Sequence, residues 1–171
     1  MLNKNFASFF GKSIYSSYLD SLSYIDDSNH ERVAGGAGGT QVTNIERFKT
    51  VYVKDEFSQD GITLIVGNGI TPATINDIKI ESQIKTLTPI SSSVIYSNKD
   101  IDPSIFYGVN KTYKNNTSES ITITEICLYT KIPYITDGRT AWSNVLLARE
   151  VIDPVIIAPG ETYTFSINID L

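Results

Sequence analysis

The last stretch of the chain, residues 159–171, is a turn followed by strict alternation between polar and apolar side chains from residue 162 to residue 171. The even-numbered residues from Thr162 to Asp170 are polar, and Pro159-Gly160 in front of them is a typical turn. The odd-numbered residues are apolar, and they are Tyr163, Phe165, Ile167, Ile169 and Leu171. Successive side chains of a strand point to opposite faces, so this pattern predicts a strand with one dry and one wet face. Such a strand needs neighbouring strands and a second layer that covers its apolar face.

The composition of the whole chain also favours sheets. A length of 171 residues is typical of one domain, or of one domain with an extension. Ten Tyr and seven Phe, with abundant Ile, Val and Thr, suit strands better than helices. Short strands at regular, turn-punctuated spacing over residues 45–171 indicate an antiparallel sheet protein. We therefore predict a mainly β fold, an antiparallel β-sandwich of jelly-roll-like type.

The N-terminal part has a different pattern. Residues 5–25 predict an amphipathic helix, which either packs on the sheet or docks as an arm on a neighbouring subunit. Its apolar stripe recurs every four residues, at Phe6, Phe10, Ile14, Tyr18 and Leu22. Residues 26–44 contain the run Gly35-Gly36-Ala37-Gly38-Gly39 and predict a glycine-rich linker without a phosphate-binding motif. We divide the chain into an arm (1–25), a linker (26–44) and the β domain (45–171).

Turn signals divide the β domain into short elements. The segments with strand pattern are residues 45–53, 62–66, 105–113 and 121–129. A strand pair broken by proline is predicted over 86–95, a hairpin turn over 114–118 and a loop over 133–143. Residues 145–152 form a further apolar run that Asp153-Pro154 interrupts. Thr74 and Asp77 resemble a capping box and predict one short helical turn.

The strand at 121–129 has an internal change of phase. Ile121 and Ile123 alternate in one phase, whereas Ile126 and Leu128 alternate in the other. Two structures explain such a change. Either a β-bulge lies near Glu125, or the strand is central and covered on both faces.

Net charge and cysteine content limit the classes of function. A formal charge of −5 and a pI of about 4.8 argue against a nucleic-acid binder, which needs basic residues to neutralise phosphates. No window approaches the roughly 18 continuous apolar residues of a membrane-spanning helix. Cys127 is the only cysteine, so an internal disulfide is excluded. The N-terminus lacks the apolar core of a signal peptide, so we expect synthesis in the cytoplasm.

The residues that catalysis or metal binding would require are sparse. A Cys-His mechanism would have to use His30, the only histidine, with Cys127, which lies inside a predicted core strand. A zinc site needs three or four His or Cys ligands, and the chain has one of each. Asp26-Asp27 and Asp100-Ile101-Asp102 are conceivable calcium ligands, but turn and cap roles explain them more simply. We predict no catalytic, cofactor or metal site, and no enzyme.

Two residues of the C-terminal half are candidates for an interface. Arg149 stands inside an apolar run, where a buried guanidinium needs a partner. Trp142 is the only tryptophan and lies in the loop predicted over 133–143. We predict that both, with the apolar stripe of the 5–25 helix, contact other subunits. The remaining aromatic candidates are half-buried sheet residues or a sugar-binding surface, and they are Tyr96, Tyr107, Tyr113 and Tyr129.

A series of short segments, in order along the chain, resembles a family of small tailed-bacteriophage proteins that are taken to be virion components. The segments are Leu2 to Phe6, Val66 to Thr74 with Asp77 and Ile80 to Ser82, Tyr113 to Asn116, Ile121 to Leu128, Leu146 to Ile152, and Ile157 to Phe165. Together they cover roughly half of the chain, from end to end, and their order carries the resemblance.

The resemblance implies a non-enzymatic structural protein of the capsid, neck or tail. Such a protein is made in the host cytoplasm and ends in the virion, where its partners are other virion proteins and copies of itself. The alternative is a carbohydrate- or receptor-binding module of a phage fibre or adhesion apparatus, which would use exposed Tyr side chains and Trp142.

Overall fold

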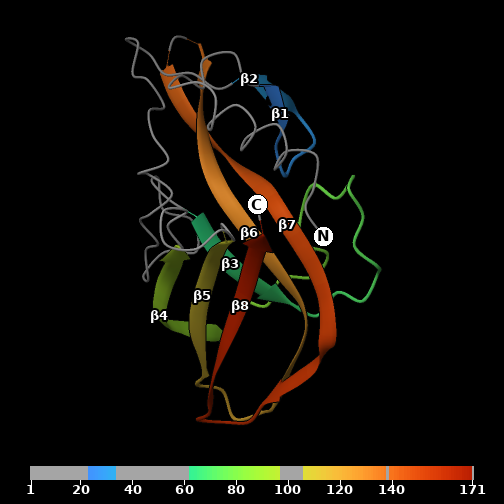
Figure 1. Cartoon of the computed structure of the whole chain (residues 1–171), viewed down its shortest axis with the longest axis vertical. Coiled ribbons are helices and arrows are strands. Elements are labelled where there is room, and N and C mark those ends of the chain that lie inside the picture. Colours follow the sequence, from blue (N-terminus) through green and yellow to red (C-terminus); the bar gives the residue numbers. More distant parts are fainter. Residues whose placement is uncertain (1–22, 34–61, 97–105, 138, 171) are drawn as a thin grey trace.

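The computed structural model of the chain describes residues 23–33, 62–96, 106–137 and 139–170. This part is mainly β, as predicted, and its elements are drawn in Figure 1. The strands are β1 (Ser23–Ile25), β2 (Glu31–Val33), β3 (Ile62–Gly67), β4 (Leu87–Tyr96), β5 (Phe106–Asn115), β6 (Ile121–Thr136), β7 (Arg139–Ile157) and β8 (Thr162–Asp170). Within these ranges, no helix has the length and apolar character that a membrane crossing requires.

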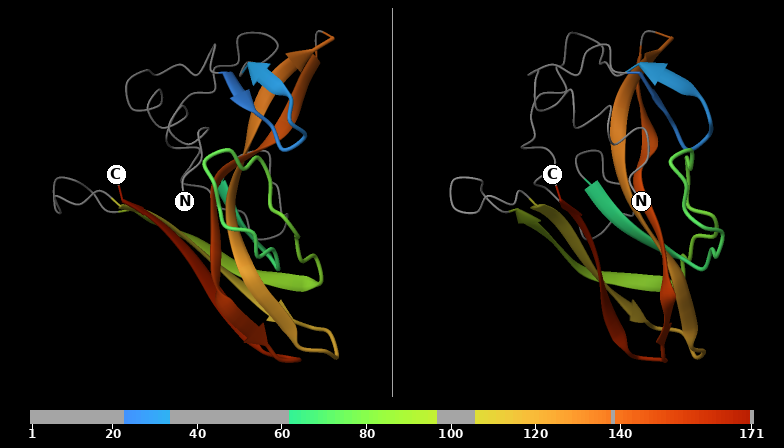
Figure 2. Two further views of the ribbon diagram at one scale, coloured as in Figure 1. Left: turned by 90° about the vertical axis from the view of Figure 1, so that its right-hand side faces the viewer. Right: turned by 45° about the vertical axis from the view of Figure 1, so that its right-hand side comes forward.

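The strands form two three-stranded antiparallel sheets and one small hairpin. One sheet has the order β3-β6-β7, the other has the order β4-β5-β8, and β1 pairs with β2. The two sheets approach each other at the lower end of the molecule and diverge towards the upper end (Figure 2). The chain passes from one sheet to the other after β3, after β5 and after β7. Each sheet therefore combines strands that are distant in sequence.

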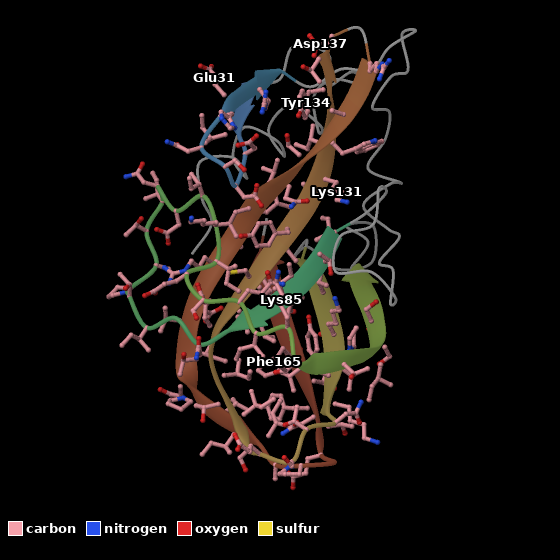
Figure 3. The ribbon with its side chains drawn as sticks, turned by 180° about the vertical axis from the view of Figure 1, so that it is seen from behind. Glu31, Lys85, Lys131, Tyr134, Asp137 and Phe165 are labelled. Atoms are coloured by element: carbon pink, nitrogen blue, oxygen red, sulfur yellow. The ribbon has the colours of Figure 1, made fainter. Side chains whose placement is uncertain are left out.

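The hairpin of β6 and β7 contains the two longest strands of the described residues. The two strands have 16 and 19 residues and stay paired up to Thr136 and Arg139. The predicted loop over 133–143 is therefore wrong, because Asp137 adopts a positive φ of 49° and turns the chain tightly. The β1–β2 hairpin, which carries Glu31, lies beside this far end, near Tyr134 (Figure 3). Arg32 of β2 stacks over the Tyr134 ring at 4.4 Å from its centroid.

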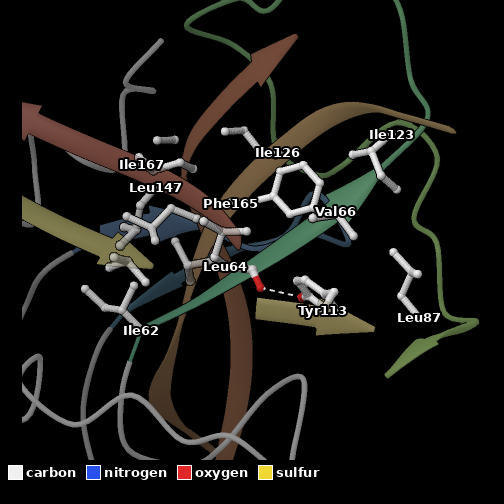
Figure 4. Close-up of a cluster of buried hydrophobic side chains, with 14 of the residues drawn as sticks. Ile62, Leu64, Val66, Leu87, Tyr113, Ile123, Ile126, Leu147, Phe165 and Ile167 are labelled. Carbon is white, nitrogen blue, oxygen red and sulfur yellow. Dashed lines mark hydrogen bonds between the residues drawn. The ribbon is translucent and has the colours of Figure 1, made fainter. Parts of the chain in front are cut away.

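The apolar faces of the two sheets meet in one hydrophobic cluster, shown in Figure 4. The Tyr113 hydroxyl donates to the Leu64 carbonyl oxygen at 2.8 Å, so the one polar group of this ring is satisfied inside the core. The buried members include Ile62, Leu64, Val66, Val109, Tyr113, Ile123, Ile126, Leu128, Leu147, Phe165 and Ile167. Burying one such aliphatic side chain contributes about 1.5–3 kcal/mol, so this cluster is the main source of stability.

The predicted C-terminal strand is present as β8. Phe165 and Ile167 are buried, whereas Thr164 and Ser166 are exposed, which confirms the dry and wet faces for these side chains. The turn before the strand is also confirmed, with Gly160 at a φ of 80°. Tyr163 differs from the prediction, since it remains 43% exposed. It stacks on Phe165 at 4.8 Å but lies near the start of an edge strand, where the opposite sheet covers little of it.

Both explanations for the change of phase in β6 are correct. The ladder with β7 shifts register between Ile123 and Glu125, which is a bulge whose extra residues, Ile152 to Pro154, lie on β7 opposite Thr124. Ile123 and Ile126 belong to the cluster between the sheets, whereas Cys127 belongs to a second cluster on the other face. The bulge therefore lies near Glu125, and β6 is also central in its sheet and covered on both sides.

Three connections differ from their predictions. Of the pair predicted over 86–95, residues 87–95 lie in one strand, β4, in which the ladder is irregular between Pro89 and Ser91. The segment after β5 is no hairpin turn, because it crosses to β6 in the other sheet. β7 also continues through Asp153-Pro154, where its ladder with β6 is irregular. Proline is tolerated at such irregular positions of edge strands, so it interrupts pairing without ending the strand.

The buried Asn115 side chain fastens the crossing after β5. Its amide nitrogen donates to the carbonyl oxygens of Glu119 at 2.7 Å and Ile157 at 2.9 Å. Its amide oxygen accepts a hydrogen bond from Thr117 N–H at 2.9 Å. This side chain ties the end of β5 to the end of β7 in the other sheet.

The N-terminal predictions fall mostly outside the described residues. Ser23–Ile25, the last three residues of the predicted 5–25 helix, form β1, so the helix prediction is wrong for them. Glu31–Val33, inside the predicted linker, form β2. Residues 1–22 and 34–44, the strand predicted at 45–53 and Asp100-Asp102 lie outside the described part.

Candidate functional site

A long loop, residues 68–86, crosses the outer face of the β3-β6-β7 sheet before the chain enters β4. It is the green segment that lies beside β6 and β7 in Figure 2. Its two ends are fixed to each other and to β3. Asn68 N–H donates to Ser82 O at 2.9 Å, and Ile84 N–H donates to Val66 O at 3.0 Å. We call this segment the 68–86 loop.

The loop is held by one buried arginine of β7. The Arg149 side chain is only 4% exposed, and its Nε donates to Glu125 Oε1 at 2.6 Å. Nη1 donates to Asp77 Oδ2 at 2.9 Å, and Nη2 donates to Glu81 Oε2 at 2.9 Å. Nη2 also donates to the Thr71 carbonyl oxygen at 3.0 Å. We call Asp77, Glu81, Glu125 and Arg149 the Arg149 cluster, and it joins β6, β7 and the loop.

Glu125 binds the loop backbone as well as the arginine. Its Oε1 accepts the N–H of Glu81 at 2.8 Å, and its Oε2 accepts those of Gly69 and Ser82, each at 3.2 Å. The bulge opposite Thr124 allows the Glu125 side chain to reach the loop. It places Thr124 and Glu125 together on the loop side of β6, and the Thr124 hydroxyl donates to Gly69 O at 2.9 Å.

Two glycines leave the space that the Glu125 carboxylate occupies. A Cβ at Gly67 would lie 2.5 Å from Ser82 O and 2.6 Å from Glu125 Oε2. A Cβ at Gly69 would lie 2.6 Å from the same carboxylate oxygen and 2.6 Å from the Glu81 Cβ. The Gly67-Asn68-Gly69 turn is therefore needed for close approach of the loop to the buried carboxylate.

The electrostatics of the cluster favour its charged state. Burial alone would raise the pKa of Asp77, but hydrogen bonds from Thr74 N–H and Arg149 outweigh it and hold the pKa below its usual value. Hydrogen bonds from Thr71 lower the pKa of Glu81. Burial alone would lower the pKa of Arg149, but hydrogen bonds to Glu125 and Asp77 raise it. The ion pairs therefore persist at neutral pH.

A small apolar cluster lies beneath the loop. Ile80 of the loop packs against Cys127 and Tyr129 of β6, together with Ile65 and Leu146. The Tyr129 hydroxyl oxygen accepts the Ile80 N–H at 2.6 Å. No buried side-chain nitrogen or oxygen of the described residues lacks a hydrogen-bond partner. The 68–86 loop is thus held by hydrogen bonds at its ends, by the Arg149 cluster at its centre and by the apolar cluster beneath it.

This fixed loop presents two large apolar side chains to solvent. Ile70 is 73% exposed and Ile75 is 56% exposed. The helical turn predicted near Ile75 is not a helix but one hydrogen-bonded turn, closed by Asp77 N–H to Thr74 O at 3.2 Å. The expected pairing of Thr74 with Asp77 is confirmed, since Thr74 N–H and Oγ1 donate to the carboxylate at 2.9 and 2.8 Å. The loop is an apolar surface with a preformed backbone.

The structure places the predicted interface residues as follows. Arg149 is buried and obtains its partners within the chain, while Glu150 is exposed on the opposite face of β7. Trp142 is half-buried and pairs with Pro133 in the β6–β7 hairpin. Its contact with another subunit stays a prediction. The other five, Phe6, Phe10, Ile14, Tyr18 and Leu22, lie outside the described residues.

The residues considered for catalysis and sugar binding have structural environments. Cys127 is fully buried, and burial, then the charge of Glu125, raises the pKa of its thiol. Asp26 accepts the N–H of Ser28 and His30, and it pairs with Arg32 Nε at 3.1 Å, so it closes the β1–β2 turn. Tyr113 and Tyr129 are in the two apolar clusters. In the described part, no three His, Cys, Asp or Glu side chains are grouped to hold a metal ion.

The carboxylate partners of Arg149 were not predicted from the sequence. Two signals were available, the need of a buried arginine for a partner and the change of phase in β6 near Glu125, but only their combination points to Glu125. A carboxylate near a bulge, on a strand that is covered on both faces, is a candidate partner for a buried arginine. Glu81 and Asp77 carried no comparable signal, because their loop has no regular periodicity.

Comparison of the chain with protein-family models, with curated proteins and with solved structures found no match. The resemblance to tailed-phage proteins therefore stays a prediction.

Proposed function

We propose that the protein is a non-enzymatic structural component of a tailed-bacteriophage virion, in the capsid, neck or tail. It is made in the host cytoplasm and assembles through contacts with other virion proteins and with copies of itself. The phage assignment rests on the ordered sequence segments named above. The assembly role is supported by one structural observation, the 68–86 loop.

The loop has the properties of a preformed protein-binding surface. Its backbone is fixed by the Arg149 cluster, so binding requires little loss of conformational entropy. Its exposed Ile70 and Ile75 would lose contact with water when a partner covers them. A buried ionic network that orders an exposed apolar loop is costly for stability alone, since hydrophobic residues often replace buried ion pairs without loss. In this proposal, Arg149 acts on the interface indirectly, by positioning the loop.

The fold we propose for the β domain is a β-sandwich of jelly-roll-like type. The support is the cluster shared by the two sheets and the three crossings between them. Such a fold displays several sheet edges and loops, which suits a protein that contacts several neighbours in an assembly.

The test is incorporation into particles. We would produce phage that carry the gene and measure the protein in purified virions by quantitative mass spectrometry. We expect many copies per particle from the natural gene, and at least a tenfold loss for the double variant Ile70→Ser/Ile75→Ser. Ile90→Ser, at another exposed isoleucine on β4, is the matched control and should be incorporated normally. Absence of the natural protein from particles, or normal incorporation of the double variant, would contradict the proposal.

A further inference from the structure

The two sheets have four outer strands, and three of them are protected against pairing with another chain. All six residues of β3 are buried. β4 contains Pro89 and an irregular ladder at that point. β7 contains Asp153-Pro154, and its Asn144 carbonyl oxygen already accepts the Asp27 N–H at 3.1 Å. Prolines, bulges, charges and covering segments are the usual ways in which proteins prevent unwanted edge pairing.

Among the described residues, β8 has no proline, bulge or covering segment, and its one charged residue, Asp170, is the last of the strand. Its ladder with β5 is regular from Thr162 to Asp170, and the strand contains no proline and no lysine. Its even-numbered residues, Thr162 to Asn168, are exposed. It forms one margin of the β4-β5-β8 sheet (Figure 1). A long and regular edge without a charge before its last residue is a template for pairing with another strand.

The hydrogen bonds at the start of β8 show which of its backbone N–H and C=O groups point towards β5. Gly160 N–H donates to Asn115 O at 2.7 Å, and Asn115 N–H donates to Glu161 O at 2.9 Å. With Gly160 at a positive φ, this is a glycine bulge in which Glu161 is the residue bonded to β5. In an antiparallel ladder the bonded residues alternate, so the odd-numbered residues face β5. The even-numbered residues, with Ser166 at their centre, face the open edge.

We propose that β8 pairs with β8 of a second copy, antiparallel and centred on Ser166, so that two three-stranded sheets become one six-stranded sheet. This inference rests on the proposed self-assembly and specifies its interface. A two-fold axis relates the copies, so Ser166 lies opposite Ser166 of the other copy. Thr164 lies opposite Asn168, and Phe165 lies opposite Ile167.

This register is compatible with the chemistry of the strand. Phe165 and Ile167 lie on the dry face of both copies, so the dry faces become continuous across the axis. The Ser, Thr and Asn side chains remain together on the wet face. Asp170, the one charged residue of β8, falls opposite Thr162, so the pairing brings no like charges together. A two-fold axis along the strands would make the pairing parallel, and it would place the dry face of one copy beside the wet face of the other.

Single cysteines in the full-length chain test the pairing. Bonded residues of an antiparallel pair have Cα atoms about 5.5 Å apart, within the range that a disulfide spans. We therefore expect Ser166→Cys to form a covalent dimer in mild oxidant, to more than half of the chains. Ser93→Cys is the matched control. Asn110 of β5 pairs with Ser166 on one side and with Ser93 of β4 on the other, so both serines lie at the same level of the sheet. Ser93→Cys should stay at least tenfold less cross-linked. Cys127 is buried and should not react.

The register is tested by mixing two variants. Thr164→Cys and Asn168→Cys chains should form disulfide heterodimers when mixed, and few homodimers when kept apart. Equal cross-linking of Ser166→Cys and Ser93→Cys, or of the mixed and separate samples, would overturn the proposal.

Light scattering of the natural protein distinguishes failure of the β8 pairing from failure of the proposed self-assembly. An oligomer in solution without a Ser166→Cys dimer would overturn β8 pairing and leave self-assembly intact. A monomer without that dimer would overturn both β8 pairing and independent self-assembly, whereas incorporation into virions is measured separately.

Discussion

The two faces of the β3-β6-β7 sheet are covered in different ways. On one face, the β4-β5-β8 sheet supplies apolar side chains such as Val109 and Phe165, and the contact is mostly hydrophobic. On the other, the 68–86 loop has little regular structure and is held by the Arg149 cluster above a small apolar patch. The same strands, β6 and β7, thus contribute an apolar layer on one side and a buried ionic network on the other.

The difference decides how each face tolerates change. An apolar layer gains stability roughly in proportion to the area buried, so a smaller side chain weakens it by degrees. A buried ionic network depends on complete pairing, since loss of one member leaves the others desolvated and unpaired. We therefore expect the hydrophobic face to determine global stability and the ionic face to determine whether the loop stays ordered.

The largest effect is expected from Arg149→Leu. Loss of the guanidinium leaves the Glu125 carboxylate buried beside Asp77 and Glu81 without a cation, which costs about 3–5 kcal/mol. Chemical denaturation measures this loss. Hydrogen exchange at the Glu81 and Ser82 amides, both bonded to Glu125, should report an early release of the loop.

Leu128→Ala is the comparison for the hydrophobic face. Leu128 is fully buried between the sheets, and its truncation should cost about 2–5 kcal/mol. In that variant, the Glu81 and Ser82 amides should exchange only with global unfolding.

The double variant Glu125→Leu/Arg149→Leu tests the ionic face further. It should recover part of the unfolding free energy that Arg149→Leu loses. Equal exchange of the Glu81 and Ser82 amides in Arg149→Leu and Leu128→Ala would contradict the distinction between the faces.

The next effect compares two buried tyrosines, one on each side of the sheet. In Tyr129→Phe, the Ile80 N–H loses its acceptor, which costs about 1–3 kcal/mol for an unpaired buried donor. In Tyr113→Phe, the Leu64 carbonyl oxygen loses the hydroxyl donor, with an expected cost of about 0.5–1.5 kcal/mol because an unpaired carbonyl oxygen is tolerated better than an unpaired N–H. Thermal unfolding of both variants gives the ranking. A larger loss for Tyr113→Phe would reverse the expected order.

The predictability of the two faces from sequence differs in the same way. Period-two alternation identified β8 and the inner residues Phe165 and Ile167, because burial between two sheets acts on every second residue. The phase change in β6 located the bulge near Glu125. The pairing of Arg149 with Asp77, Glu81 and Glu125 could not be read, since it joins residues 24 to 72 positions apart through an irregular loop. Crossings between sheets were missed for a related reason, as a turn sequence does not show which sheet the next strand joins.

Acid should weaken the ionic face selectively, as the next smaller effect. The pKa values of Asp77 and Glu81 are lowered from ordinary values of 3.8 and 4.5, so the unfolded chain binds protons more readily than the folded chain. Their stabilising contribution is complete above pH 5, roughly the upper limit of these ordinary values, and is lost as the pH falls below 4 through the lowered values. Hydrogen exchange between pH 2 and 6, corrected for intrinsic rates, should show the loop opening first. Arg149→Leu should lose the part of this dependence that comes from the arginine, whereas the hydrogen bonds from Thr74 and Thr71 retain the rest.

The smallest effect is expected at the residue next to Arg149. Glu150 lies on the opposite face of β7 and is exposed, so Glu150→Gln should change the free energy of unfolding by no more than about 0.5 kcal/mol. Adjacent residues of a strand face opposite environments, and β7 is an edge strand whose other face is open to water at this point. Denaturation of Glu150→Gln beside Arg149→Leu measures the contrast directly. A loss of several kcal/mol in Glu150→Gln would mean that the charge on this face also supports the loop, and that the two faces of the sheet are coupled through β7.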